Sequence, residues 1–242
     1  MGLSAALSIV APPLCFGCGA HAGGDRALCA ACRRALRWLG VPAEDDGGLD
    51  TGGAAGAEGG GPGGPAGAAG GGLFVWAPLA YEGPAAALVR ALKFRGARGL
   101  ADVMAGPIAA GAPPWLFGRE AGSGAAEAAR LVPVPLHPAR RRRRGFNQAA
   151  LLASALATRT GLKVDDCLER RGGAGTQMGR DRPERAAAMA QAVRVRGRAP
   201  PLAVLVDDVV TTGATLGACA AALRREGAVD VRAVTYARTP GR

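Results

Sequence analysis

The sequence predicts an α/β fold: an open parallel sheet with helices on both faces, plus a small N-terminal zinc ribbon. Strand-like and helix-like segments alternate between residues 73 and 238. Residues 202–206 form a continuous apolar run, which is typical of a strand buried on both faces. Four cysteines near the N-terminus form two Cys-x-x-Cys pairs, the usual spacing of a zinc site. The strand–helix–strand order after residue 202 implies a right-handed crossover and hence parallel strands.

Composition divides the chain into three parts. Residues 1–40 hold four of the six cysteines and form the predicted zinc-ribbon module. Residues 41–72 are Gly- and Ala-rich with almost no larger apolar side chain, so burial cannot offset their ordering entropy and a flexible linker is expected. Residues 73–242 form the predicted α/β domain.

The expected elements of this domain follow one another along the chain. They are strand 73–81, helix 84–95, strand 130–136, helix 146–160, strand 202–206, helix 212–226 and strand 229–236. Prolines 133 and 135 suggest that the second strand has an edge position or an irregular end. The helices have the following expected inward residues: Leu88 and Leu92; Ala150, Leu151, Ala155 and Leu156; Leu216, Ala220 and Leu223. Gly227 marks the end of the last helix.

Charge and hydropathy limit the classes of partner. The net charge is +11, and since only two of the 30 basic residues are lysines, 28 are arginines. Arginine binds phosphate groups in a bidentate manner, which favours polyanionic ligands, although GC-rich coding produces the same composition. No stretch of about 18 apolar residues occurs, so membrane insertion is not expected. The apolar start at residues 3–14 lacks a basic segment and contains two prolines, so a cytoplasmic location is expected.

Residues 204–216 are the most informative segment. Asp207 and Asp208 follow the buried run, and a loop with Thr211, Thr212 and Gly213 then opens into a helix. Ligands of open parallel sheets bind beyond the carboxyl ends of the strands, and backbone N–H groups at a helix N-terminus bind anions. A sugar phosphate fits this arrangement, with the acids on sugar hydroxyls or on a metal. The structural alternative is that the acids end a strand and Thr212 caps a helix.

These thirteen residues resemble the signature of type I phosphoribosyltransferases, which bind phosphoribosyl pyrophosphate. The resemblance implies that Asp207 and Asp208 hold the ribose hydroxyls. It assigns the 5′-phosphate to the loop residues Thr211, Thr212, Gly213, Ala214 and Thr215. It also implies Mg²⁺ as a cofactor of the bound pyrophosphate.

Further segments are similar to the ComF family. They are Leu92-Lys93-Phe94, the run 132–136 with Arg144-Gly145-Phe146-Asn147-Gln148, Thr176-Gln177 with Arg185, and the cysteine pairs. The family resemblance implies a link to natural competence and single-stranded DNA. It makes residues 170–185 a flexible loop that closes over the site, with Gln177 and Arg185 as matching residues. Ala188 and Val193 depart from the family pattern, which has Asn and an aromatic residue there.

Five consecutive arginines, residues 140–144, precede the helix that begins near Phe146. A type I fold places its pyrophosphate loop here, and Arg144 and Gly145 are the predicted ligands, with Asn147 and Gln148 orienting the loop. Two other interpretations of residues 140–143 stay open: a solvated basic stretch, or a patch for the phosphates of DNA. Aromatic residues for base stacking are scarce, with only Phe146 close in the sequence.

The cysteine pattern Cys15-x-x-Cys18 and Cys29-x-x-Cys32 predicts one structural Zn²⁺, which supplies the folding energy that a small module lacks. Cys219 lies on the apolar side of a predicted helix and is expected to be buried. Lys93 is either a surface lysine or part of the site.

The leading hypothesis is a Mg²⁺-dependent phosphoribosyl-pyrophosphate-binding protein that transfers or senses the phosphoribosyl group. Its predicted catalytic residues are Asp207, Asp208, Arg144 and Lys93. The alternative is a non-enzymatic accessory protein of DNA uptake that binds single-stranded DNA or competence proteins. The sequence contains no pattern that assigns the acceptor base or the oligomeric state.

Overall fold

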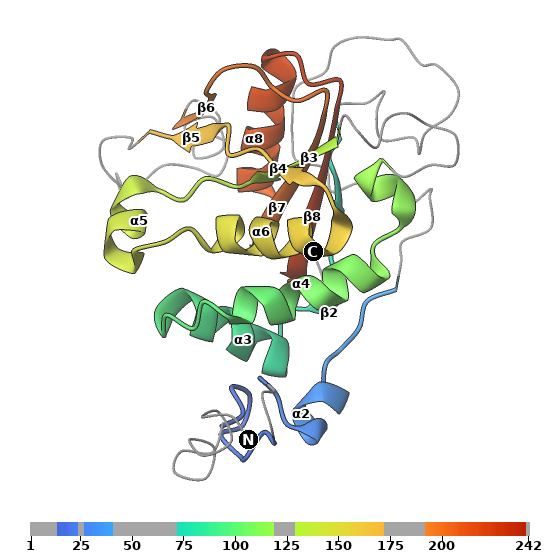
Figure 1. Ribbon diagram of the computed structural model, residues 1–242, viewed down its shortest axis with the longest axis vertical. Coiled ribbons are helices and arrows are strands. Elements are labelled where there is room, and N and C mark those ends of the chain that lie inside the picture. Colours follow the sequence, from blue (N-terminus) through green and yellow to red (C-terminus); the bar gives the residue numbers. More distant parts are fainter. Residues whose placement is uncertain (1–13, 24–26, 41–71, 119–128, 172–191, 241–242) are drawn as a thin grey trace.

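The computed structural model describes residues 14–23, 27–40, 72–118, 129–171 and 192–240. Its centre is a six-stranded parallel sheet in the order β1-β8-β7-β3-β4, with β2 paired to β8 beyond β1. The strands are β1 (Phe74–Trp76), β2 (Leu79–Ala80), β3 (Ala129–Pro133), β4 (Lys163–Val164), β7 (Leu202–Val210) and β8 (Asp230–Arg238). The longest strands, β7 and β8, thus lie in the interior of the sheet (Figure 1).

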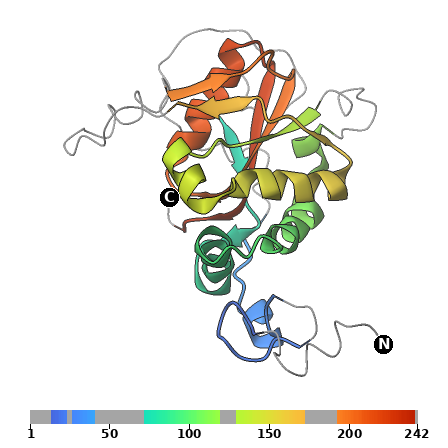
Figure 2. The same ribbon diagram turned by 60° about the vertical axis from the view of Figure 1, so that its left-hand side comes forward.

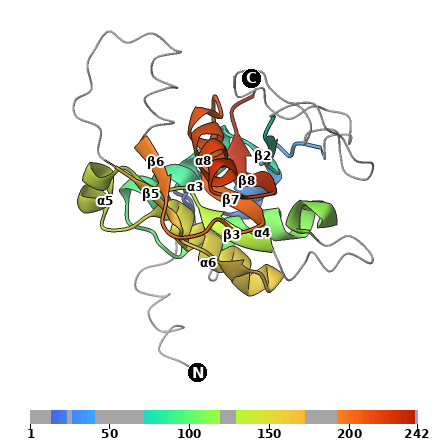
Figure 3. The ribbon, with the colours of Figure 1, turned by 90° about the horizontal axis from the view of Figure 1, so that it is seen from above.

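Helices cover both faces of this sheet, which confirms the predicted fold class. On one side lie α3 (Gly83–Phe94), α4 (Leu100–Gly111) and α6 (Gln148–Thr160); on the other lies α8 (Ala214–Arg225) (Figure 3). The sheet separates two hydrophobic cores, one on each face, and alternate side chains of β7 point into one core or the other. Val204 and Val206 belong to the α3–α4–α6 core, and Ala203 and Leu205 to the α8 core. Such two-sided burial explains the continuous apolar run at residues 202–206.

The predicted strand–helix–strand unit after residue 202 is confirmed: α8 connects the parallel strands β7 and β8. Leu216, Ala220 and Leu223 are buried on α8, and Gly227 has a positive φ of 92° just beyond the helix. Cys219 is also completely buried, as expected.

Two expectations about the elements were wrong, and a third was confirmed in only one of its two alternatives. β7 does not end before the acids but continues to Val210, because Asp207 and Val209 keep pairing with Thr235 and Ala237 of β8. β3 lies between β7 and β4 rather than at the edge, although its pairing does stop at a proline. The inward face of α6 is shifted: of the four residues expected there, Leu156 is buried, whereas Ala150, Leu151 and Ala155 are half-buried. Its buried residues are Gln148, Ala149, Leu152, Ala153, Leu156 and Thr160.

The N-terminal module contains the short helix α2 (Ala30–Arg34) and lies at the end of the molecule below α3 (Figures 1 and 2). The chain leaving it joins the sheet at β2. The amide of Leu39 donates to the carbonyl of Pro78 at 2.8 Å, and the amide of Ala80 donates to the carbonyl of Arg37 at 2.9 Å. Residues 37–39 therefore extend the sheet edge beside β2, with an antiparallel bridge between Trp38 and Leu79.

Smaller elements complete the domain. They are the 3₁₀ turn η1 (Pro114–Phe117), the helix α5 (Pro138–Arg144) and the antiparallel pair β5 (Leu168–Arg170) and β6 (Val193–Val195). The arginine run thus forms a helix of its own rather than a loop. Among the described residues, no helix has the length and apolarity needed to cross a bilayer.

Candidate functional site

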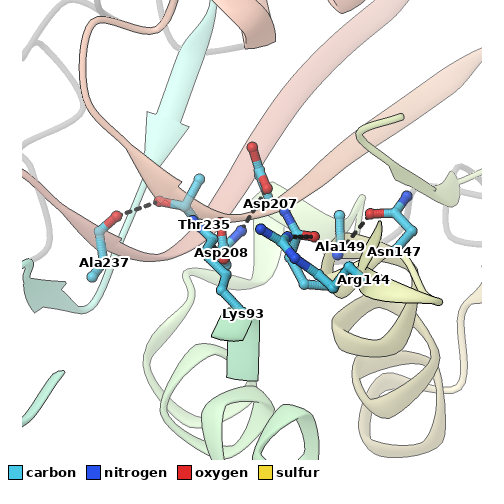
Figure 4. A network of polar contacts seen from close by, with 9 residues as sticks. Lys93, Arg144, Asn147, Ala149, Asp207, Asp208, Thr235 and Ala237 are labelled. Carbon is cyan, nitrogen blue, oxygen red and sulfur yellow. Dashed lines mark hydrogen bonds and ion pairs between the residues drawn. The ribbon is translucent and has the colours of Figure 1, made fainter. Parts of the chain in front are cut away.

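The two acids lie where β7 reaches the carboxyl edge of the sheet, and successive strand residues point to opposite faces. Asp208 points to the α3 side and is only 2% exposed. Its Oδ2 lies 2.9 Å from Lys93 Nζ, which comes from the last turn of α3 (Figure 4). In the described chain no aligned hydrogen-bond donor reaches that oxygen, so the ion pair is its main compensation. The structure thus places Lys93 against a site acid rather than in solvent.

Asp207 has a different environment. The residue is partly accessible, yet protein surrounds its carboxyl, whose Oδ1 accepts a 2.8 Å hydrogen bond from the amide of Asp208. Loss of hydration, and next the negative charge of Asp208, raise the pKa of Asp207 well above its usual range. The charge of Lys93 acts in the opposite direction but does not cancel this effect. Asp207 therefore holds a proton more tightly than a surface aspartate does.

Arg144 ends α5 and reaches toward the same acids. Its Nη1 donates to Gln148 Oε1, and its guanidinium lies 5.5 Å from the centre of the Phe94 ring. Burial lowers the pKa of Arg144, and the charges of both acids act to raise it. The following Gly145 has φ +78° and closes α5 by donating its amide to the carbonyl of Arg141 at 2.8 Å. A side chain in that left-handed conformation is strained, which accounts for glycine at this position.

Asn147 holds the segment after α5 in place. Its Oδ1 accepts from the amide of Ala149 at 3.2 Å (Figure 4). Its Nδ2 donates to the carbonyl of Val134 at 3.0 Å. It therefore caps α6 and ties that cap to the end of β3. This arrangement agrees with the orienting role expected for Asn147, and Gln148 supports Arg144 directly.

The loop from Thr211 to Thr215 connects β7 to α8. Thr211 and Thr212 are exposed, and Gly213 is buried with φ +74° as the N-cap of α8. The N-cap of α8 is thus Gly213 and not Thr212, so the capping alternative was wrong; Thr212 Oγ1 accepts from the amide of Ala214 at 3.5 Å. Among the described contacts, no hydrogen bond or ion pair joins either acid to this loop. The structure brings Lys93 and Arg144 to the acids, while the loop lies at the strand end as a separate group of donors.

The other predicted residues divide between surface and core. Arginines 140–143 are exposed on α5. Gln177, Arg185 and Ala188 lie outside the described residues, together with most of the predicted flexible loop. Val193 lies in β6, is 1% exposed and packs in the α8 core.

Two aromatic contacts were missed by the sequence reasoning, which considered only Phe146 near the arginines. The Phe94 ring lies beneath Arg144, and Arg98 lies 4.9 Å from the centre of the Phe146 ring. Together these pairs link the end of α3 to the segment around Gly145. The available signal was that a chain with only five phenylalanines places one of them directly after Lys93.

The four cysteines of the N-terminal module converge as predicted. Their sulfur atoms all lie within 4.8 Å of one another, and the Sγ atoms of Cys18 and Cys29 are 3.7 Å apart. A tetrahedral Zn²⁺ with Zn–S bonds of about 2.3 Å separates its sulfurs by about 3.8 Å, so the cluster fits this ion.

The thiols of this cluster are electrostatically distinct. Burial opposes ionisation of Cys15, but amide donors from Cys29, Cys18 and Gly17 outweigh it and lower the pKa of the Cys15 thiol to about 6. The amide of Cys32 likewise lowers the pKa of Cys29. Burial raises the pKa of Cys32 to about 12. A metal ion would favour the thiolate form of all four ligands.

Comparison with known proteins supports the N-terminal module and finds two relatives that match part of the chain. The double zinc ribbon domain family matches residues 6–46. The matched segment contains four cysteines, enough for one tetrahedral site. The DNA utilization protein YhgH of Salmonella typhi is 38% identical over 112 residues, covering 46% of this chain and 49% of that protein. YhgH of Salmonella typhimurium strain LT2 matches with the same values. The chain thus spans about half the length of the curated relatives it matches.

Proposed function

We propose that this protein binds phosphoribosyl pyrophosphate with Mg²⁺ at the carboxyl edge of its sheet, and that it transfers or senses the phosphoribosyl group. The observation that carries the proposal is the ion pair of Asp208 with Lys93, with Arg144 close by, at the end of the strand that leads into α8. Asp207 and Asp208 provide acceptors for sugar hydroxyls, whereas Lys93 and Arg144 provide cations for phosphate groups.

Each group has a role in such a ligand. The acids accept hydrogen bonds from the ribose hydroxyls, and the N–H groups and hydroxyls of residues 211–215 bind the 5′-phosphate. Arg144 and the exposed backbone of Gly145 bind the pyrophosphate. In the transfer an acceptor nucleophile bonds to the anomeric carbon, the bond from that carbon to the pyrophosphate oxygen breaks, and Arg144 stabilises the charge that pyrophosphate carries away. Mg²⁺, whose preferred ligands are carboxylate and phosphate oxygens, would add to that stabilisation.

The ion pair between Lys93 and Asp208 gives the site a defined resting state. A carboxylate that is 2% exposed is costly to keep charged, and the ammonium at 2.9 Å compensates it. A ligand that donates hydroxyls to Asp208 can take over part of this compensation, which frees Lys93 to contact phosphate. The raised pKa of Asp207 means that Mg²⁺-dependent binding strengthens as the pH rises and this acid ionises.

The test is calorimetric titration of the full chain with phosphoribosyl pyrophosphate, with and without Mg²⁺. Asp207→Asn and Asp208→Asn should each weaken Mg²⁺-dependent binding at least tenfold. Glu226→Gln is the matched control, because this exposed carboxylate ends α8 far from the acids. Absence of binding, or equal affinity of the Asn variants and the control, would refute the proposal. A screen of free bases for pyrophosphate release would then separate transfer from sensing.

Single-stranded DNA binding is the second candidate. Arginines 140–143 are exposed, and the relatives are named DNA utilization proteins. Each phosphate contact with a single strand contributes a slope of about −0.7 to the dependence of log affinity on log salt concentration. Four such arginines would give a slope of about −3, which should fall toward zero when all four are replaced by Ala. A slope near zero in the unmodified chain would exclude this role.

The remaining assignments form part of the same proposal. The four cysteines hold one structural Zn²⁺. Residues 1–40, 41–72 and 73–242 act as ribbon, linker and ligand-binding domain, and the protein works in the cytoplasm. Competence proteins are its candidate partners.

A further inference from the structure

A second cleft, of about 450 Å³, lies between α5, the outer side of α6 and β5. Its lining includes Leu136, Arg141, Asn147, Leu151, Leu168 and Arg170. None of the predicted ligands Lys93, Arg144, Asp207, Asp208 or residues 211–215 contributes to that lining. The cleft is therefore a separate site, and its volume falls within the range that small organic ligands occupy.

The apolar part of the cleft can receive a planar ring. Phe146 and Leu168 are buried, and Leu136 and Leu151 are half-buried in the same lining. Contacts with these side chains remove a flat apolar group from water without requiring any specific hydrogen bond.

The polar part of the cleft carries uncompensated positive charge. Neither Arg141 nor Arg170 forms an ion pair within the described chain. The two acids of the lining already have partners: Asp166 lies 4.0 Å from Arg196, and Glu169 lies 3.6 Å from Arg171. A negatively charged ligand group in the cleft would therefore contact guanidinium groups that form no ion pair with a carboxylate of the described chain.

Arg170 is the strongest indication of an absent anion. Its Nε is buried and has no hydrogen-bond partner, although the residue lines the cleft. A buried donor without an acceptor is unfavourable, and an anion held by the other N–H groups of this guanidinium would compensate its charge. Arg140 lies near enough to Arg170 to interact electrostatically with it, which adds to the positive field. Burial, and next the charges of Arg170 and Arg140, lower the pKa of the neighbouring His137.

We propose that this cleft binds a free nucleoside monophosphate. Its phosphate contacts Arg170 and Arg141, and its base packs on Phe146, Leu151 and Leu168. A nucleotide combines the planar ring and the compact anion that the two parts of the cleft require. The inference stands independently of phosphoribosyl pyrophosphate binding at the acids.

Calorimetric titration of the full chain with AMP, CMP, GMP and UMP tests the proposal. Arg170→Ala should weaken nucleotide binding about tenfold or more, the loss expected for one charge-assisted hydrogen bond, and Arg141→Ala should act in the same direction. Arg142→Ala is the matched control, since it removes an exposed arginine of the same helix that does not line the cleft. Asp208→Asn should leave nucleotide binding unchanged, which distinguishes this cleft from the first site.

Four results with nucleotides or inorganic phosphate would overturn the proposal. They are absence of binding by every nucleotide, equal binding by Arg170→Ala and the unmodified chain, loss of binding in Asp208→Asn instead, and inorganic phosphate binding as tightly as the nucleotides. Binding by a thymidylate decamer alone would also overturn it, because the ligand would then be a strand. Thermal unfolding confirms that each variant is folded, and Arg141→Ala, at an exposed position, keeps the test valid if Arg170→Ala does not fold.

Discussion

Replacing Lys93 by Met should destabilise the protein through the buried acid that it leaves uncompensated. Asp208 is 2% exposed, and its Oδ2 lies 2.9 Å from Lys93 Nζ. Breaking a buried ion pair by removing one partner costs about 3–5 kcal/mol. Because the Lys93 side chain is 22% exposed, solvent screens part of the interaction, so we expect about 2–3 kcal/mol. For a chain of this size that corresponds to a loss of roughly 4–12 °C in melting temperature.

A double-mutant cycle isolates this interaction. Lys93→Met, Asp208→Asn and the double variant are unfolded by heat and by urea at pH 8. The double variant should recover much of the loss, because it removes both charges, and the coupling energy should be about 2 kcal/mol. Lys163→Met is the control, since Lys163 is the other lysine of the chain and is exposed on β4. Lowering the pH toward 5 should reduce the Lys93→Met deficit, because the pKa of Asp207 is raised and its protonation removes a negative charge beside Asp208.

The reasoning would be refuted by a Lys93→Met variant as stable as Lys163→Met at pH 8, or by additive single effects with no coupling. Either result would mean that water, not Lys93, solvates Asp208. The candidate site would then lack the cationic partner on which its assignment depends.

Three further outcomes are expected. Asp207→Asn should stabilise the protein at neutral pH while weakening ligand binding. Because the pKa of Asp207 is raised in the folded state, the stability of the unmodified chain falls as the pH rises from about 4, the ordinary Asp range, through that raised pKa. The difference in melting temperature between Asp207→Asn and the unmodified chain should therefore grow across this pH range. A difference that became smaller would contradict the argument from burial. Chelation should release one zinc ion per chain, measured by a colorimetric assay, and should lower the melting temperature of residues 14–40, measured by circular dichroism. A zinc-free protein of unchanged stability would exclude a structural ion. Gly145→Ala should lower the free energy of unfolding by about 1 kcal/mol, because φ is +78°, and should also weaken pyrophosphate binding. The control Gly161→Ala (φ +73°) should lower stability in the same way without affecting binding. Equal losses of binding in the two variants would show that Gly145 does not belong to the site.

The sequence was sufficient to predict the parts of the fold where local pattern and tertiary packing agree. The apolar run of β7, the inward face of α8 and the four-cysteine cluster depend on short-range periodicity or spacing. The same holds for α3, whose predicted inward residues Leu88 and Leu92 are buried.

The rest depends on contacts that no local pattern reveals. The helix α4 was not predicted, because Pro107 inside it and glycines at both ends conceal its period. β7 continues through two aspartates, residues of low strand propensity, because β8 supplies the hydrogen bonds. Lys93 and Asp208 are separated by more than a hundred residues, so only the packing of α3 against the sheet could bring their charges together.

The hydrogen bonds of residues 37–39 with β2 give the metal cluster a role beyond its own folding. An unprotected strand at the border of a sheet exposes amides and carbonyls that recruit strands from other molecules. Here the segment that follows the cysteines occupies that border. Zinc binding would therefore also protect the protein against self-association. Without zinc, molecules would aggregate through the exposed backbone groups beside Leu79.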